Sequence, residues 1–247
     1  MRLPLLSLVF AATSLASAQP PGKFPPDSLV NTKVIPRSTP VIEVIGTMRN
    51  FTSALGVRCQ FCHVGREGQP LAEFDFPSDQ KRNKLVARQM MRMVAEINGR
   101  LDTIPERSQS PVTVTCITCH RGVNRPVPLY TLVQDAAVAV SADSAIRAYK
   151  ALRAKYFGRD AYDFSEPSLS IAAFRTARAG KPDEALTLLR YNEELFPNSS
   201  AMSVFKGNIQ LMKGDTTAAE AAFREALRRD STNAEARGRL QAIRRKP

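Results

Sequence analysis

The chain has 247 residues, of which 43% are hydrophobic, enough for one large or two modest domains with a real core. This composition excludes an intrinsically disordered protein. The formal net charge of +12 favours acidic partners or an anionic lipid surface, but no mixture of aromatic and basic residues predicts nucleic-acid binding.

Residues 1–18 have the pattern of a cleavable secretory signal peptide. Arg2 supplies one positive charge, an apolar run follows, and residues 16–18 are small, as at a cleavage site. We therefore expect a periplasmic or extracellular protein in which residues 19–38 form an N-terminal extension. Retention of the same segment as a membrane anchor is the alternative, but its apolar run is short for a mature transmembrane helix.

A helix is predicted from Thr39 to Leu55. Thr39 can cap its start and Pro40 suits its first position. Its apolar side chains recur every three or four residues, at Val41, Ile45, Met48, Phe51 and Leu55. Gly56 then ends the helix, since glycine readily takes the left-handed conformation that reverses the chain.

The four cysteines and two histidines all belong to two copies of one short motif. The copies are Cys59-x-x-Cys62-His63 and Cys116-x-x-Cys119-His120. This spacing allows two thiols to add to the vinyl groups of a haem and places an imidazole where it can ligate the iron. We therefore predict two covalently bound haem c groups, held by the cysteines as thioethers and by His63 and His120 as iron ligands.

Three other uses of these cysteines can be weighed. A structural zinc site would employ four thiolates but leave the two equivalent histidines unexplained. Disulfides within two four-residue loops would be a poor framework for a chain of this length. A thioredoxin-like redox pair would require a βαβ pattern, and neither motif has one nearby.

The sixth ligand of each iron must come from another residue type, because both histidines are already used. Methionine is the natural donor, and its thioether raises the haem potential. Met1 belongs to the signal peptide, and Met202 and Met212 lie in a C-terminal segment of different character, where we expect them to be core residues rather than ligands. The remaining candidates are Met48, Met90, Met91 and Met93. A methionine on an apolar helical stripe can also be ordinary core filling.

A second helix is predicted from near Ser78 to about residues 98–99. Its apolar stripe contains Val86, Met90, Met93, Val94, Ile97 and Leu101. Met91 is turned by about 100° from Met90. The periodicity therefore favours Met90 or Met93 over Met91 and does not separate those two.

Residues 48–59, 86–98 and 114–122 resemble the cytochrome c subunit of photosynthetic reaction centres. The resemblance runs from near Thr39 to Pro128. It implies a mainly α, dihaem cytochrome c domain at 39–130, in which a helix before each motif packs along the haem and supplies a methionine.

Carried over to this chain, the resemblance assigns Met48 to the haem of His63 and Met90 to the haem of His120, with Met93 as second choice. That family carries four haems, one of which has two histidine ligands, whereas this chain matches a single haem pair. The resemblance implies that the electron-transfer partner is a membrane reaction centre or a respiratory complex.

The C-terminal part is predicted to be a separate unit. Residues 131–164 are expected to hold a linker and one helix, from Ser141 to Phe157. Residues 165–247 show a 34-residue period that pairs Ala173 with Gly207, Gly180 with Gly214, Ala185 with Ala219, and Leu189 with Phe223. This pattern resembles tetratricopeptide repeats, an α-solenoid that binds protein segments, with a capping helix from Asn233 to Ile243.

We expect an electron-transfer protein rather than an enzyme. A haem peroxidase or reductase is the alternative, but it needs an open iron face with acid and base groups, and the chain has no tryptophan and no spare histidine. The second alternative is a respiratory or extracellular electron carrier that is unrelated to photosynthesis. Seven arginines of the last helices suggest an acidic partner or a second copy of the chain: Arg224, Arg228, Arg229, Arg237, Arg239, Arg244 and Arg245.

Overall fold

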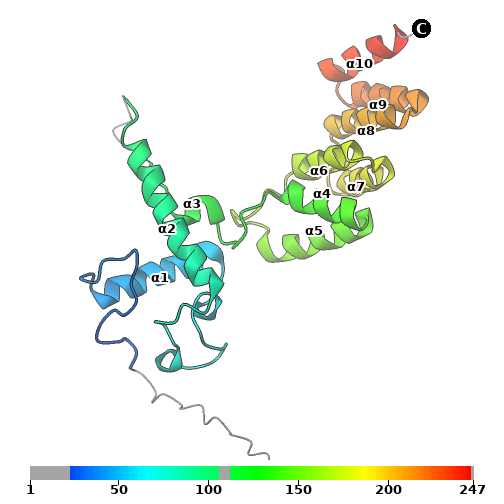
Figure 1. The fold of residues 1–247 in the computed structure, drawn as a ribbon. Coiled ribbons are helices and arrows are strands. Elements are labelled where there is room, and N and C mark those ends of the chain that lie inside the picture. Colours follow the sequence, from blue (N-terminus) through cyan, green and yellow to red (C-terminus); the bar gives the residue numbers. More distant parts are fainter. Residues whose placement is uncertain (1–22, 106–111, 246–247) are drawn as a thin grey trace, which may run out of the picture. The chain divides into compact units, whose positions relative to one another are not determined.

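The computed structural model describes residues 23–105 and 112–245, and over these ranges the chain is mainly α-helical and contains no β-strand (Figure 1). The predicted signal peptide lies outside them. The chain forms two compact units: Met1–Ser53 with Val57–Thr115, and Ala54–Gly56 with Cys116–Pro247. None of the helices described is both long and apolar enough to cross a bilayer.

The first unit contains the helix predicted before the first motif. Helix α1 spans Val41–Leu55 and directly follows Pro40, whose carbonyl oxygen accepts the N–H of Val44 at 3.2 Å. Gly56 follows with φ of 64°, so the chain leaves the helix through a left-handed residue, as the sequence predicted. Two 3₁₀ turns come next, η1 at Cys59–Phe61 and η2 at Leu71–Glu73.

The second predicted helix, α2, spans Arg82–Leu101 and begins four residues later than expected. The residues before it are held in a turn instead. The Ser78 N–H donates to the Asp75 carboxylate at 3.0 Å. The Lys84 ammonium reaches back to the carbonyl oxygens of Phe76, Pro77 and Ser78 at 2.8, 2.9 and 2.8 Å. These carbonyls are thereby engaged outside the helix.

Two asparagines connect α2 to distant backbone. Near its start, Asn83 Nδ2 donates to the Phe61 carbonyl oxygen at 3.1 Å. Near its end, Asn98 Nδ2 donates to the Val114 carbonyl at 2.9 Å, and Asn98 Oδ1 accepts the Val114 N–H at 2.8 Å. The helix is therefore fixed at one end to the first motif and at the other to the segment two residues before Cys116.

Apolar packing inside the first unit is sparse. Helix α2 has no buried residue along its 20 residues. Phe74 is buried and lies against Gly65, where an added Cβ would come within 2.5 Å of the Phe74 ring. Phe76 stacks on Phe74 and meets Phe24 of the N-terminal extension, with ring centroids 5.6 and 5.5 Å apart. Small polar and aromatic clusters therefore hold this unit together.

The second unit is built from helical hairpins (Figure 1). Its helices are α3 (Cys116–His120), α4 (Leu129–Ala139), α5 (Ala142–Tyr156), α6 (Glu166–Arg178), α7 (Pro182–Leu195), α8 (Ser200–Lys213), α9 (Thr216–Arg229) and α10 (Ala234–Arg244). The pairs α4–α5, α6–α7 and α8–α9 pack as hairpins, and α10 packs on α9.

The segment predicted as a linker contains a helix. In α4, Leu129, Val133 and Ala137 recur every four residues and are buried in the core shared with α5, α6 and α7. Pro126 and Pro128 suggested a linker, but Pro128 stands at the N-cap of α4. The helix α5 and its N-cap Ser141 agree with the prediction.

The 34-residue period of the sequence corresponds to a repeat in the helices and in their packing. Helices α7 and α9 are displaced by 34 residues at both ends. Gly180 and Gly214 both have φ near 83°, after α6 and α8 respectively. Gly207 allows close approach of α9, since a Cβ there would lie 2.5 Å from the Phe223 ring. The predicted capping helix is α10, with the Asn233 side chain accepting the Ala236 N–H at 2.9 Å.

Candidate functional site

The first motif is folded into a single turn. The Val57 N–H bonds back to the Thr52 carbonyl at 3.0 Å, so the chain reverses at the end of α1. The N–H groups of Cys62 and His63 then both donate to the Cys59 carbonyl, at 3.2 and 2.9 Å. Both thiols and the imidazole are thereby presented by five consecutive residues, as thioether attachment of one haem requires.

Burial affects two of the four thiols. All four cysteines are free. Burial raises the pKa of the Cys62 thiol, with a smaller contribution from Cys59, and burial is also the main cause of the raised pKa of Cys116. A thioredoxin-like pair requires a lowered thiol pKa instead. In the described ranges, no group of three or more His, Cys, Asp and Glu side chains is placed to hold a metal ion.

His63 lies in a partly apolar environment. Its ring meets the Phe76 ring edge to face at 4.9 Å. Burial lowers the pKa of His63, the positive charge of Lys84 lowers it further, and the Phe76 backbone partly opposes both. The buried Nδ1 of His63 makes no hydrogen bond of standard geometry within the described residues. A neutral imidazole is the form that ligates a metal.

The second motif forms the short helix α3 and a tight turn that orients its histidine. The Val123 N–H donates to the His120 carbonyl at 2.9 Å, and the two central residues, Arg121 and Gly122, have φ of 49° and 88°. This turn brings the Val123 carbonyl oxygen within 2.9 Å of His120 Nδ1. Because a carbonyl only accepts, Nδ1 carries the proton and Nε2 keeps a lone pair for iron.

Gly122 also packs against the end of α1. Its N–H donates to the Ala54 carbonyl at 2.8 Å. An added Cβ at Gly56 would lie 2.1 Å from the Gly122 carbonyl oxygen, so only glycine fits at this close approach.

The candidate methionines differ in exposure. Met48 on α1 and Met91 on α2 are half-buried, whereas Met90 and Met93 are 39% and 43% exposed. Met202 is fully buried in the second unit, as expected of a core residue. Met212 was also expected in that core but is exposed on α8. The structure does not separate Met90 from Met93.

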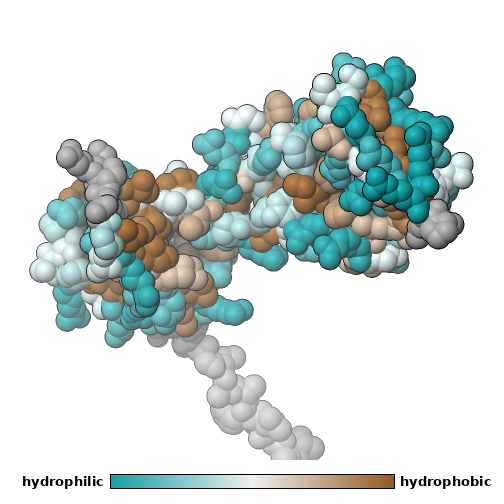
Figure 2. Space-filling model, turned by 90° about the horizontal axis from the view of Figure 1, so that it is seen from above, coloured by the Kyte–Doolittle hydropathy of each residue, from teal (hydrophilic) through white to brown (hydrophobic). Residues whose placement is uncertain are grey.

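The exposed surface of α2 suits a porphyrin. Leu85 and Val86 are as exposed as Met90 and Met93, so one helix presents four large apolar side chains, and Figure 2 shows apolar surface gathered on the first unit. Soluble proteins rarely leave such a row uncovered without a binding function. A haem is flat and largely apolar, so two pairs of free cysteines, a histidine directly after each pair and an apolar methionine stripe fit this group.

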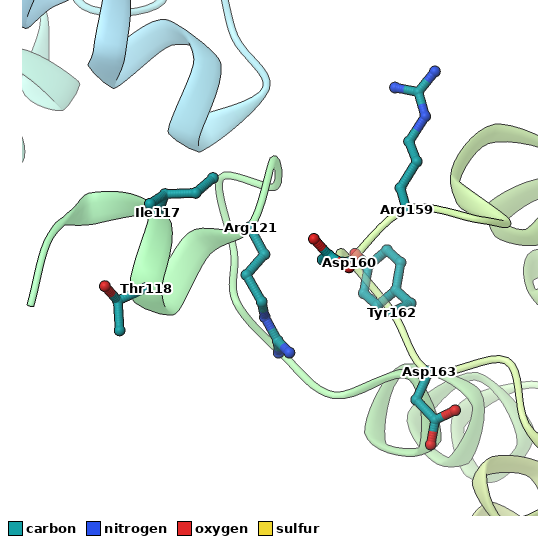
Figure 3. A pocket seen from close by; sticks show the side chains of 7 residues that line it. All are labelled: Ile117, Thr118, Arg121, Arg159, Asp160, Tyr162 and Asp163. Atoms are coloured by element: carbon teal, nitrogen blue, oxygen red, sulfur yellow. The ribbon is translucent and has the colours of Figure 1, made fainter. Parts of the chain in front are cut away.

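Each motif borders an open pocket. One, of about 330 Å³, includes Cys59 and Gln60 of the first motif together with Phe74. The other, of about 590 Å³, includes Ile117 and Thr118 of the second motif and the loop before α6. In Figure 3, Arg121 extends into this pocket, whereas Arg159 points away from it. Charged and polar groups dominate this second pocket.

Four supporting residues were not predicted: Asn83, Lys84, Asn98 and Val123. The three side chains bind backbone groups of other segments, and Val123 acts through its own carbonyl. Backbone groups are the same at every position, so the sequence carries no pattern that identifies these pairs. Gly122, two residues after His120, was the one sequence signal for the role of Val123, since glycine favours a tight turn.

Residues 67–163 match the family described as the photosynthetic reaction centre cytochrome C subunit. The photosynthetic reaction center cytochrome c subunit of Thermochromatium tepidum is 31% identical over 91 residues, which cover 33% of this chain and 21% of that protein. The chain thus spans about a fifth of the length of this curated relative. These matches support a relationship to c-type cytochromes, which hold haem covalently.

The family match covers the candidate site unequally. Met90, Met93 and the second motif lie inside residues 67–163, whereas Met48 and the first motif lie before them. The match also continues beyond Pro128 through α4 and α5. The resemblance recognised in the sequence began earlier, near Thr39, and ended earlier.

Proposed function

We propose that the chain is an exported dihaem c-type cytochrome that transfers electrons to a membrane redox complex. One haem is attached at Cys59 and Cys62 and the other at Cys116 and Cys119. His63 and His120 ligate the two irons. The bound haems supply the reversible one-electron chemistry, and the protein holds them and tunes their potentials.

The observation that carries this proposal is the combination of two haem-attachment motifs with α2. This 20-residue helix has no buried residue, yet it carries the apolar stripe of Val86, Met90 and Met93. A helix in a folded unit normally buries such a stripe against a partner. A haem attached at a neighbouring motif is the partner that the cysteine and histidine chemistry provides.

The proposed sixth ligands are Met48 for the haem of His63 and Met90 for the haem of His120, with Met93 as second choice. The thioether sulfur of methionine is a soft donor that favours ferrous iron. The half-buried position of Met48 on α1 and the exposed position of Met90 on α2 both leave the sulfur available to a flat group lying along the helix.

Mass spectrometry of the mature holoprotein tests the attachment. We expect the mass of two haems, retained after acid-acetone extraction, when the protein is made with the cytochrome c maturation machinery. Replacing Cys116 and Cys119 by Ala should remove one haem and leave the other. Bound zinc or two disulfides in place of haem would refute the proposal.

A carbon monoxide titration separates an electron carrier from a haem enzyme. Iron with histidine and methionine ligands has no free position, so the spectrum of the reduced protein should not change. A peroxidase or reductase needs an open iron face and should bind carbon monoxide at once. The Met90→Ala variant is the positive control, because loss of its ligand opens one iron.

The helical hairpins of the second unit have the offset and glycine positions of tetratricopeptide repeats, and we assign them to docking an acidic redox protein or another copy of the chain. The arginines expected to form the docking surface are partly engaged: Arg224 pairs with Glu220, and both Arg228 and Arg229 pair with Glu225. Arg244 and Arg245 are exposed. Reversing these two charges should weaken a salt-sensitive association measured by sedimentation, whereas reversing Glu220 should not.

A further inference from the structure

The two proposed haem ligands differ in what their Nδ1 atoms meet. His120 Nδ1 lies 2.9 Å from the Val123 carbonyl oxygen. A hydrogen bond to a carbonyl makes the imidazole a stronger donor through Nε2. Stronger donation stabilises ferric iron, so it lowers the reduction potential of the haem on His120.

The residue that packs on the His63 ring has its carbonyl engaged by a cation. The Phe76 ring meets the His63 ring at 4.9 Å, and the Phe76 carbonyl oxygen accepts a hydrogen bond from the Lys84 ammonium at 2.8 Å. An oxygen polarised toward a full positive charge is a poorer acceptor for a second donor. The buried Nδ1 of His63 makes no hydrogen bond of standard geometry in the described part of the chain, in contrast to His120 Nδ1.

The Lys84 charge is held in place and is only partly screened. Its ammonium also bonds to the carbonyls of Pro77 and Ser78 and pairs with Asp79 at 3.2 Å. The side chains of Lys84 and Arg88 are 12% and 13% exposed, whereas that of Asp79 is 39% exposed. Solvent therefore screens the carboxylate more than the two cations. Lys84 is held next to His63 by geometry: its ammonium bonds to the backbone of Phe76, whose ring meets the His63 ring at 4.9 Å, and the neighbouring Asn83 bonds to Phe61 of the first motif.

We propose that Lys84 is a positioning residue that keeps the haem on His63 at a higher reduction potential than the haem on His120. A nearby cation and a weakly donating imidazole both favour ferrous iron. When both haems are bound, the haem held by His63 would therefore be reduced at a higher potential than the haem held by His120. This inference rests on the proposed dihaem function.

Spectroelectrochemical titration of the full-length holoprotein tests the order of the two potentials. The Cys59→Ala variant marks the first haem, because a haem with one thioether keeps one vinyl group and absorbs at longer wavelength. Cys116→Ala marks the second haem in the same way. We expect the marked haem to be reduced first in Cys59→Ala and last in Cys116→Ala.

Substitutions at Lys84 and Asp79 should move the first potential in opposite directions. Lys84→Gln should lower the reduction potential of the haem held by His63. The expected change is roughly tenfold in the equilibrium constant for its reduction, which is about 59 mV for one electron. Asp79→Asn removes the opposing charge and should raise the same potential. Lys84→Arg keeps the cation and should restore it. Simple loss of packing would move all three variants the same way.

Arg92→Gln is the matched control. Arg92 is an exposed cation two turns beyond Lys84 on α2, and its loss should leave both potentials nearly unchanged. Two attached haems with the reversed order, with equal potentials, or with equal shifts in Lys84→Gln and Arg92→Gln would refute this inference and leave the proposed function standing. Fewer than two haems by mass would refute both.

Discussion

The two units of this protein are both helical but reach stability by different means. In the second unit, helices α4 to α10 bury continuous apolar clusters, including Tyr149, Leu188 and Phe223. In the first unit, α2 buries no residue, and its position depends on asparagine side chains at both ends. Helices are therefore stabilised by an apolar core in the second unit. In the first unit, α2 is held by the hydrogen bonds of Asn83 and Asn98, which we call its two asparagine clamps, and its apolar stripe is left exposed.

The contrast shows that helix content is a poor guide to where folding free energy arises. Burial of apolar area is the main favourable term in folding. Helix α2 has no fully buried residue and leaves Leu85, Val86, Met90 and Met93 exposed, so the chain alone supplies less of this term here than in the second unit. In the proposed function, the covalently attached haems supply it, so folding of the first unit and haem attachment are coupled.

The largest expected effect comes from preventing haem attachment. We expect a variant with all four cysteines replaced by Ala to lose amide protection throughout α2, while α4 to α9 keep theirs. Hydrogen exchange with mass spectrometry of the variant and the holoprotein measures both units in one sample. Full protection of α2 in the haem-free protein would show that the asparagine clamps are enough to keep this helix folded. The two units would then not differ in their dependence on haem.

The second prediction weakens the core of the helical unit alone. Phe223→Ala should destabilise that unit by about 3–5 kcal/mol, because the fully buried ring packs against Gly207 and leaves a cavity when removed. Denaturant unfolding followed by circular dichroism gives the change. Met212→Ala is the control, since Met212 is exposed and its loss should cost less than about 0.5 kcal/mol. Haem spectra that changed with Phe223→Ala would contradict independent units.

The third prediction compares methionines between the units. Met48→Ala and Met90→Ala should each remove a methionine-to-iron charge-transfer band and lower one haem potential, with a small effect on the helical unit. Met202→Ala should do the reverse: it destabilises the helical unit and leaves both spectra unchanged. If Met93→Ala removes the band and Met90→Ala does not, the second-choice ligand is the correct one.

The smallest expected effect is electrostatic and confined to α9. Hydrogen bonds from Arg228 and Arg229 lower the pKa of Glu225 from 4.5 to about 2. A lowered folded-state pKa gives stability that is present above the ordinary value and lost as the pH falls toward 2. The melting temperature of the wild type should therefore decline more between pH 4.5 and 2 than that of Glu225→Gln. Because these groups are exposed, added salt should shrink the difference.

The sequence predicted those parts that depend on local periodicity or special backbone conformations. Helix α1 ends at Gly56 with positive φ, and the 34-residue period appears as the displacement between α7 and α9. Helical spacing and glycine requirements are properties of a few neighbouring residues, so one sequence reveals them.

The remaining features depend on contacts between distant segments. Helix α4 was read as a linker because Pro126 and Pro128 stand before it, and its buried face becomes significant only against α6. The start of α2 was placed too early because the Lys84 ammonium binds carbonyls six to eight residues before it. The choice between Met90 and Met93 depends on where a haem lies, which helical periodicity does not specify.

The clamps at the two ends of α2 limit how this chain can diverge. Asn83 and Asn98 are fifteen residues apart, so the backbone groups they hold are separated by about 22 Å of helix. A single inserted residue would lengthen α2 by about 1.5 Å but rotate one asparagine by about 100° away from its partner. An insertion near a whole turn restores the direction of both side chains but moves one of them by about 5.4 Å, so the backbone segment that it binds must move with it. The length of α2 is therefore expected to change in relatives only together with the segment before Cys116 or the first motif.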